Sequence, residues 1–161
     1  MLTRTILSIA CLFLVSINAV PQTPVMPEGN LYLRALSACV EKQAQEYKNL
    51  GGGRDYQNRI VGRNIFLTEK LPTQIGVYRI EYLDGNELTL RYKKSRKPLP
   101  ILSMRPMVSE DGTLRIGLAD YWFSYEKQAM TYSLEGGCNV FFRYDCERKA
   151  HVLERVDLWG V

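Results

Sequence analysis

The second half of the chain alternates apolar and polar residues in one segment after another, and this two-residue period constrains the fold most strongly. In the first such segment, Tyr78, Ile80 and Tyr82 alternate with charged residues. Alternation of this kind places the apolar side chains on one face of a β-strand. Asp-Gly pairs at 84–85 and 111–112 are typical of the tight turns that join antiparallel strands. The pattern therefore predicts an antiparallel meander of about seven strands.

Two further expectations about individual strands follow from the same pattern. Residues 87–93 alternate apolar and polar side chains, so they are predicted to form a strand after the turn at 84–85. The pair Gly136-Gly137 is predicted to separate a strand that ends at residue 134 from one that begins at residue 138.

The segment 113–125 is about twice as long as a typical strand and changes its parity halfway. Its first half has apolar residues at 114, 116 and 118, whereas its second half has them at 121, 123 and 125. One regular strand cannot place both sets on the same face. A β-bulge near Ala119–Asp120 would return both halves to a common face. The alternative is a strand buried on both faces, which Trp122 would support.

One segment, from Asn30 to Leu50, has the spacing of an amphipathic helix. Its apolar side chains recur every three to four residues, and polar side chains fill the other side. Asn30 is a favourable N-cap, and the run Gly51–Gly53 is predicted to end the helix. The next residues, 54–75, fit either a short helix or an irregular strand. The apolar positions of the helix are Leu33, Leu36, Val40, Ala44 and Tyr47.

One helix followed by antiparallel strands predicts an α+β fold, in which the N-terminal helix packs on a curved sheet. The length of the chain fits one domain, placed at 30–161. The order of elements from about Asn30 to Trp159 resembles cystatin-like rolls, including the nuclear-transport-factor type. The tail also resembles small uncharacterised exported bacterial proteins, through Phe142-Arg143-Tyr144-Asp145-Cys146-Glu147 and Trp159-Gly160. Neither resemblance implies a particular activity.

Residues 1–19 have the pattern of a secretory signal peptide. Arg4 provides a positive start, 5–17 form an uncharged apolar run, and Ala19 is a small residue suited to cleavage. The run is shorter than the roughly 20 residues that an ordinary membrane-spanning helix needs. The alternative is a lipoprotein signal that ends before Cys11, although Ser8 stands where a bulky Leu is expected. We therefore expect an exported protein, either periplasmic or secreted.

The expected mature chain begins with an extended, proline-rich arm at 20–29. Removing 1–19 leaves 142 residues and lowers the net charge from +4 to +3. This charge is too small to predict a nucleic-acid-binding protein. The rest of the chain contains no second apolar stretch that could span a membrane, so no transmembrane segment is predicted for the mature chain.

Three cysteines remain after residue 19: Cys39, Cys138 and Cys146. Export permits disulfides, and an odd count leaves one thiol over. Cys138 and Cys146 would lie about 26 Å apart in an unbroken strand, beyond the reach of a disulfide. A bridge would therefore join Cys39 to one of them, and Cys146 is favoured because it sits at a strand end that a helix could cover. The alternative is three reduced, buried thiols.

No residue is predicted to be catalytic, and no metal or cofactor is predicted. His151 is the only histidine and lies beside the charged turn at 147–149, where a solvated side chain is expected. One histidine and three scattered cysteines offer no close pair of metal ligands. The run Gly51–Gly53 lacks the following Lys-Ser or Lys-Thr of a phosphate-binding loop.

Asp120 is the centre of a predicted pocket. It interrupts an apolar stretch of the long strand, so its carboxylate is expected to face the hollow of the curled sheet. Burial there would raise its pKa and suit it to acid or base chemistry. Tyr82, Arg105 and Trp122 are predicted to line the same pocket. The alternative is that Asp120 points outward or forms a salt bridge with Arg105.

The segment 91–97 has five cations in seven residues. Such a segment could contact anionic lipid, polysaccharide or an acidic patch on a partner protein. The alternative is a solvated hairpin turn that discourages edge pairing. Tyr92 alone is aromatic here, so no nucleic-acid site is predicted. The cations are Arg91, Lys93, Lys94, Arg96 and Lys97.

These features together predict an exported, non-enzymatic binding or interaction domain, whose partner is a protein or a small anionic ligand. Ten tyrosines and two tryptophans suit an interaction surface, although they equally suit a sheet core. Two alternatives stay open. One is an enzyme that uses Asp120 as its acid or base, and the other is an inhibitor or immunity-type protein that plugs the active site of another exported protein.

Overall fold

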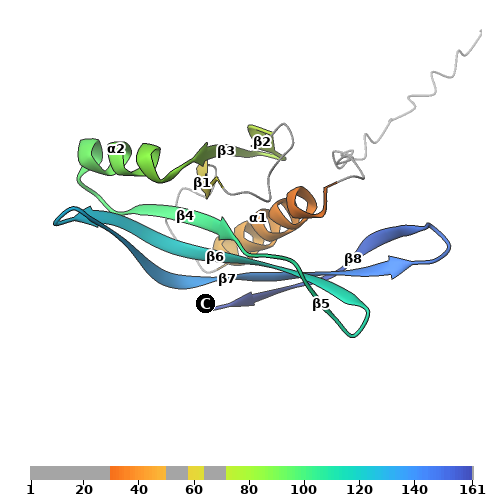
Figure 1. Cartoon of the computed structure of the whole chain (residues 1–161). Coiled ribbons are helices and arrows are strands. Elements are labelled where there is room, and N and C mark those ends of the chain that lie inside the picture. Colours follow the sequence, from red (N-terminus) through yellow and green to blue (C-terminus); the bar gives the residue numbers. More distant parts are fainter. Residues whose placement is uncertain (1–29, 50–57, 64–71, 161) are drawn as a thin grey trace, which may run out of the picture.

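The computed structural model describes residues 30–49, 58–63 and 72–160. This part of the chain forms an α+β fold, with a helix at its N-terminal end packed on an open, mostly antiparallel sheet (Figure 1). The described elements are α1 (Leu31–Asn49), β1 (Asn58–Gly62), β2 (Gln74–Ile75), β3 (Tyr78–Leu83), α2 (Gly85–Ser95), β4 (Leu99–Met104), β5 (Val108–Glu110), β6 (Thr113–Glu126), β7 (Ala129–Asp145) and β8 (Ala150–Trp159).

The sheet has the strand order β2-β3-β1-β4-β6-β7-β8, with β5 paired beside β6. The prediction of a purely antiparallel meander is wrong at β1, which pairs parallel with both β3 and β4. Since β3 and β4 both run parallel to β1, the chain must cross over between them. Parallel strands need such a crossover connection, and a helix usually provides it. Here α2 is that connection.

The existence of α2 corrects the prediction of a strand at 87–93. Asp84 caps the helix through a capping box: its carboxylate accepts the N–H groups of Asn86 and Glu87, and the Glu87 carboxylate accepts the Asp84 N–H. Leu88 and Tyr92 are buried four residues apart on one helix face, whereas the intervening Leu90 is 68% exposed. The apparent two-residue alternation therefore combined the buried Leu88 and Tyr92 with Leu90, which lies on the opposite, exposed face of the helix.

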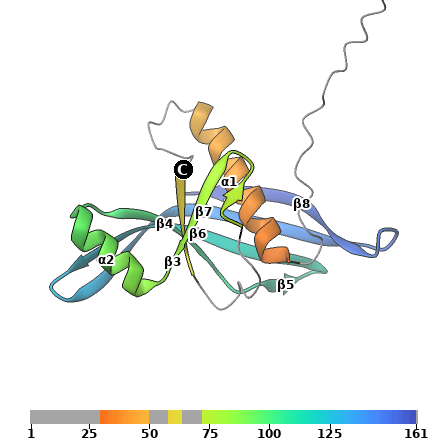
Figure 2. The same ribbon diagram turned by 90° about the horizontal axis from the view of Figure 1, so that it is seen from above.

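The predicted first helix is confirmed at α1. The Asn30 side chain accepts hydrogen bonds from the backbone N–H groups of Tyr32, at 2.9 Å, and Leu33, at 3.4 Å, as an N-cap does. The predicted stop at 51–53 lies outside the described residues. Viewed from above, α1 crosses over β6, β7 and β8 (Figure 2). The α1 side chains buried with these strands are Leu33, Ala35, Leu36, Cys39 and Val40.

The two helices cover opposite faces of the strands, which explains the parity change in β6. Ile116 and Leu118 belong to the core beneath α1, whereas Phe123 packs with α2 in a second core. The β4 strand shows the same division: Leu102 faces the first core and Ile101 the second. In Figure 1, α2 lies by the end of the sheet where β6 turns into β7. The alternative of a strand buried on both faces is therefore the correct one.

An irregularity does occur at the predicted place, but the extra residue belongs to β7. Asp120 pairs with Gly136 and Tyr121 pairs with Leu134, so Glu135 is one extra residue on β7 at this point of the register. The β6 strand keeps its regular alternation against β4. A β-bulge of this kind increases the local twist of the strands.

The pair Gly136-Gly137 lies inside the single strand β7, so the predicted break between two strands is wrong. A Cβ atom on Gly137 would lie only 2.0 Å from the Leu118 carbonyl oxygen and 2.7 Å from the Trp159 ring. A Cβ on Gly136 would lie 2.6 Å from the Trp159 carbonyl oxygen. The two glycines therefore permit a close approach of neighbouring strands instead of ending one.

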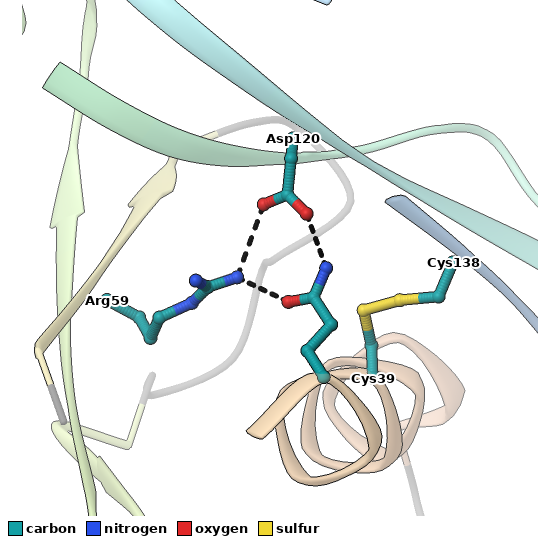
Figure 3. Close-up of a disulfide and its surroundings, with 5 residues drawn as sticks. Cys39, Arg59, Asp120 and Cys138 are labelled. Atoms are coloured by element: carbon teal, nitrogen blue, oxygen red, sulfur yellow. Dashed lines mark hydrogen bonds and ion pairs between the residues drawn. A yellow bond between two sulfur atoms is a disulfide. The ribbon is translucent and has the colours of Figure 1, made fainter. Parts of the chain in front are cut away.

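A disulfide joins Cys39 of α1 to Cys138 of β7, across 99 residues (Figure 3). The predicted partner, Cys146, is wrong: its thiol is free and exposed in the turn after β7. Cys138 pairs with Leu118 in the middle of the sheet, beneath α1, whereas Cys146 lies beyond the end of the strand. The position at which the helix crosses β7 therefore decided which cysteine was in reach.

Candidate functional site

Asp120, the centre of the predicted pocket, points toward α1 and not outward. Its Oδ2 accepts a hydrogen bond from Nε2 of Gln43, and its Oδ1 lies 3.2 Å from Nη2 of Arg59. The same Arg59 nitrogen donates to Oε1 of Gln43. The three side chains form a closed triangle beside the disulfide (Figure 3). The alternative of an ion pair with Arg105 is wrong, because the arginine beside Asp120 is Arg59.

Three separate elements bring the triangle together. Gln43 follows Cys39 by one helical turn, so the disulfide anchors the helix next to it. Asp120 pairs with Leu102 of β4, which in turn pairs with Val61 of β1, two residues beyond Arg59. Sequence reasoning missed both Gln43 and Arg59. For Gln43 a signal existed, because this polar residue continues the apolar spacing of Leu36 and Val40.

The triangle is almost closed off from solvent. Gln43 is 2% exposed, and the side chains of Arg59 and Asp120 are 11% and 14% exposed. A charge at such a depth needs an opposite charge and hydrogen bonds to compensate its lost hydration. Asp120 has both, and each of its carboxylate oxygens is engaged. A carboxylate held in this way connects the helix to the sheet.

A hollow of about 320 Å³ lies beside the triangle. It contains two of the four residues predicted for the pocket, Asp120 and Trp122. Glu135, the extra residue at the β7 irregularity, adds a second carboxylate to the lining. The complete lining is Asn58, Arg59, Ile60, Pro100, Ile101, Leu102, Asp120, Tyr121, Trp122 and Glu135.

The other two predicted pocket residues lie elsewhere. Tyr82 packs against the core beneath α1, and its buried hydroxyl has no hydrogen-bond partner within the described chain. Burial raises the pKa of the Tyr82 hydroxyl to about 12. Arg105 is exposed just beyond β4 and donates a hydrogen bond of 3.4 Å to the Tyr121 hydroxyl. His151 is also remote, and its ring contacts that of Tyr144 at the far end of β7.

The basic segment 91–97 forms the last turns of α2 and the residues after it, not a hairpin turn. Arg91 makes two hydrogen bonds to the Glu81 carboxylate, at 2.6 and 2.7 Å, and so is neutralised. Lys93 lies over the Tyr125 ring, with Nζ 4.8 Å from its centroid. Lys93 and Lys94 also complement the negative end of the helix dipole.

Beside α2, exposed and partly buried apolar side chains form what we call the β6–β7 surface: Tyr121, Tyr125, Met130, Tyr132 and Leu134. Pairing of β6 with β7 places all five on the sheet face that α2 partly covers. Met130, Tyr132 and Leu134 are 44%, 46% and 54% exposed. The Tyr132 ring makes edge contacts with Tyr121 and Phe123, which hold it in place. A contiguous apolar surface of this kind is typical of an interaction site.

Within residues 30–49, 58–63 and 72–160, no group of three or more His, Cys, Asp or Glu side chains could hold a metal ion. In the same part of the chain, neither helix has the length and apolar character needed to cross a bilayer. The predicted resemblances to cystatin-like rolls and to small exported bacterial proteins stay predictions. Comparison with protein-family models, curated proteins and solved structures gives no match.

Proposed function

We propose that this chain is an exported, non-enzymatic binding domain that docks an acidic partner protein on the β6–β7 surface. The observation that carries the proposal is the row Met130, Tyr132 and Leu134, three apolar side chains that stay about half exposed on one sheet face. A solvent-facing strand would ordinarily present polar side chains at these positions.

The shape of the surface supports a protein partner. Tyrosine is over-represented among the residues that dominate binding energy, because a rigid ring buries much area at little entropic cost. Tyr132 is braced by two neighbouring rings, so binding would not need to order it. The adjacent Met130 and Leu134 provide adaptable apolar contacts on either side.

Charge supports an acidic partner. Lys93 lies on Tyr125 at the border of the surface, and Lys94 and Lys97 are exposed on the same end of α2. Lys127 adds a further exposed cation in the turn between β6 and β7. The neighbouring carboxylate, Glu126, accepts a hydrogen bond of 3.4 Å from the Tyr92 hydroxyl. The carboxylates at the other end of α2, Asp84 and Glu87, lie near Met130 and are engaged in the helix cap. The lysines near Tyr125 therefore attract an acidic surface to that end of the β6–β7 surface.

The disulfide supports export. Bridges between cysteines persist in oxidising compartments and are rare in the reducing cytosol. The Cys39–Cys138 bridge therefore fits a chain whose residues 1–19 are removed as a signal peptide. The mass of the protein from the exported fraction tests this part, since we expect a chain that begins at Val20.

Site-specific photo-crosslinking tests the binding proposal. A photoreactive phenylalanine analogue replaces Tyr132 or, as a control of matched exposure, Leu153 of β8, which is 47% exposed. We expect adducts with an acidic protein of the exported fraction from position 132 and none of the same mass from position 153. The purified partner should then bind the wild type at least about tenfold more tightly than a Lys93→Glu, Lys94→Glu variant. Identical adducts from both positions, or none from position 132, would refute the proposal.

The identity of the partner separates the remaining alternatives. If the partner is an exported enzyme whose activity falls on binding, the domain is an inhibitor or immunity-type protein. If instead the chain is an enzyme that uses Asp120, the Tyr132 adducts are absent, and an Asp120→Asn variant that still folds loses the activity. The engaged state of both Asp120 oxygens favours the binding proposal.

A further inference from the structure

A second hollow, of about 410 Å³, lies on the sheet face opposite α1, where the chain passes from β4 to β5. We call it the arginine hollow. Two arginines, an asparagine and a tryptophan surround it, and a glycine forms part of its floor. The lining is Arg105, Pro106, Val108, Arg115, Gly117, Asn139 and Trp159. From this arrangement we propose that the arginine hollow binds a small organic anion, a carboxylate attached to a ring.

The floor of the hollow is built by strand pairing. Gly117 of β6 pairs with Asn139 of β7, and its carbonyl oxygen accepts the backbone N–H of Arg105 at 2.8 Å. A Cβ on Gly117 would lie 3.4 Å from Oδ1 of Asn139 and 3.5 Å from Cδ of Arg105. The missing side chain therefore leaves a depression, and the Asn139 amide and the Arg105 chain border it.

One wall of the hollow is aromatic. Trp159 ends β8 opposite Gly137, and its ring would lie 2.7 Å from a Cβ on that glycine. The indole is therefore packed against bare backbone and is only partly exposed. A rigid indole held in this way offers a flat face to the ring of a ligand.

The charge of the hollow is positive. The hydrogen bond that Arg105 donates goes to a neutral group, the Tyr121 hydroxyl. Arg115 has Glu110 at 4.0 Å, but that carboxylate is 67% exposed on the rim. Asp157, which pairs with Asn139 and so lies on the same face, is engaged by Arg155 at 3.1 Å. The planar guanidinium groups match the geometry of a carboxylate, which can accept two parallel hydrogen bonds from each.

Four side chains together specify the ligand class: Arg105, Arg115, Asn139 and Trp159. Two guanidinium groups recognise an oxyanion, the Asn139 amide can donate to or accept from a hydroxyl, and the indole stacks on a ring. A uronic acid or a benzoate has this combination, whereas inorganic phosphate lacks the ring and glucose lacks the charge. The site differs from the β6–β7 surface in its residues and its ligand, although Tyr121 borders both. Its test is therefore independent of the proposed partner protein.

Calorimetric titration of the intact oxidised protein tests the proposal, with glucuronate, benzoate, glucose, acetate and inorganic phosphate as separate probes. We expect glucuronate or benzoate to bind with a Kd on the order of 1 mM or tighter, and glucose and acetate to bind at least about tenfold more weakly. Equal binding of acetate or phosphate would overturn the role of Trp159. Equal binding of glucose would overturn the role of the arginines, and no saturable binding of any ring carboxylate would overturn the site.

Substitutions locate the binding. Three substitutions should each weaken the binding of the ring carboxylate about tenfold or more. Arg105→Met and Arg115→Met each remove a positive charge, and Gly117→Val fills the depression at the bottom of the hollow. Arg91→Met, which removes the same charge from α2, should leave the Kd unchanged. If Gly117→Val does not fold, Arg115→Lys is used in its place. This variant keeps the positive charge and removes the bidentate hydrogen bonding of the guanidinium. If Arg91→Met and Arg105→Met weaken binding equally, the anion responds only to the net charge of the protein, and the proposal is overturned.

Discussion

The bridge between Cys39 and Cys138 allows a prediction whose size follows from the structure. It closes a loop of 99 residues, and in the chain-entropy model a loop of that length destabilises the unfolded chain by about 4.7 kcal/mol. Domains of this size are stable by about 5–15 kcal/mol, so the bridge provides a large part of the total. Because both cysteines are 0% exposed, their sulfur atoms also fill space in the core beneath α1.

Two perturbations separate these contributions. Reduction under unfolding conditions, followed by refolding with reductant, breaks the bridge and keeps both sulfur atoms. The double variant Cys39→Ala, Cys138→Ala removes the atoms as well. We expect the reduced wild type to lose about 4–5 kcal/mol and the double variant to lose more, because it also leaves a cavity. Cys146→Ser, at the exposed free thiol, should change stability by less than about 0.5 kcal/mol.

Urea unfolding measures all three. With a slope of about 2 kcal/mol per molar urea, the midpoint of the reduced protein should fall by about 2 M, while that of Cys146→Ser should not move. Alkylation of the native, unreduced chain from residue 20 onward should modify one thiol, Cys146. A midpoint shift below about 0.5 M on reduction would refute the stabilising role of the bridge. Labelling of Cys39 or Cys138 without reductant would refute the bridge itself.

Three further predictions concern single residues. Gly137→Ala should abolish cooperative thermal unfolding, because its Cβ would lie 2.0 Å from a β6 carbonyl oxygen, whereas Gly62→Ala, with 3.8 Å to its nearest atom, should keep the wild-type Tm. Asp120→Ala should lower the free energy of unfolding in urea by about 3–5 kcal/mol, because the nearly buried Arg59 guanidinium loses the Asp120 carboxylate. A decrease of less than about 1 kcal/mol would contradict this prediction. Burial raises the pKa of Tyr82 from 10.0 to about 12, so as pH rises through this interval the unfolded chain releases a proton that the folded chain keeps, and stability falls. The Tyr82→Phe variant should lack this part of the loss of stability at high pH. We would measure the free energy of unfolding of both proteins from about pH 9 to 12. A difference between them that does not change with pH would contradict the prediction.

The helix at 87–93 shows how a local pattern misleads when two periods fit the same residues. Leu88, Leu90 and Tyr92 satisfy a two-residue period, but Leu88 and Tyr92 alone also satisfy the spacing of a helix. The decisive signal was Asp84 followed three residues later by Glu87, which is a capping box. The exposure of Leu90, which breaks the strand interpretation, is visible only in the tertiary structure.

The candidate site was predictable only in part. The place of Asp120 in an apolar stretch left two possibilities, a carboxylate that faces the hollow of the sheet or one that points outward, and the structure places it toward α1. Its partners were not predictable, because Arg59 reaches it only when β1 inserts beside β4 in a parallel arrangement. The residue pattern within β1 or β6 does not predict that the two strands lie close together, because this arrangement depends on the crossover through α2.

Features that local hydrogen bonding and side-chain alternation control could be read from the order of amino acids. These include the helix that begins after Asn30, the strand character of most of the second half and the α+β class. The tertiary structure decided which strands are neighbours, which cysteine meets Cys39 and which sheet face each helix covers. A local residue pattern selects the conformation of a segment. Contacts between distant segments depend on how every element between them packs, so they cannot be read from that pattern. The apolar surface left exposed on β7, from which the function is proposed, is a product of that packing.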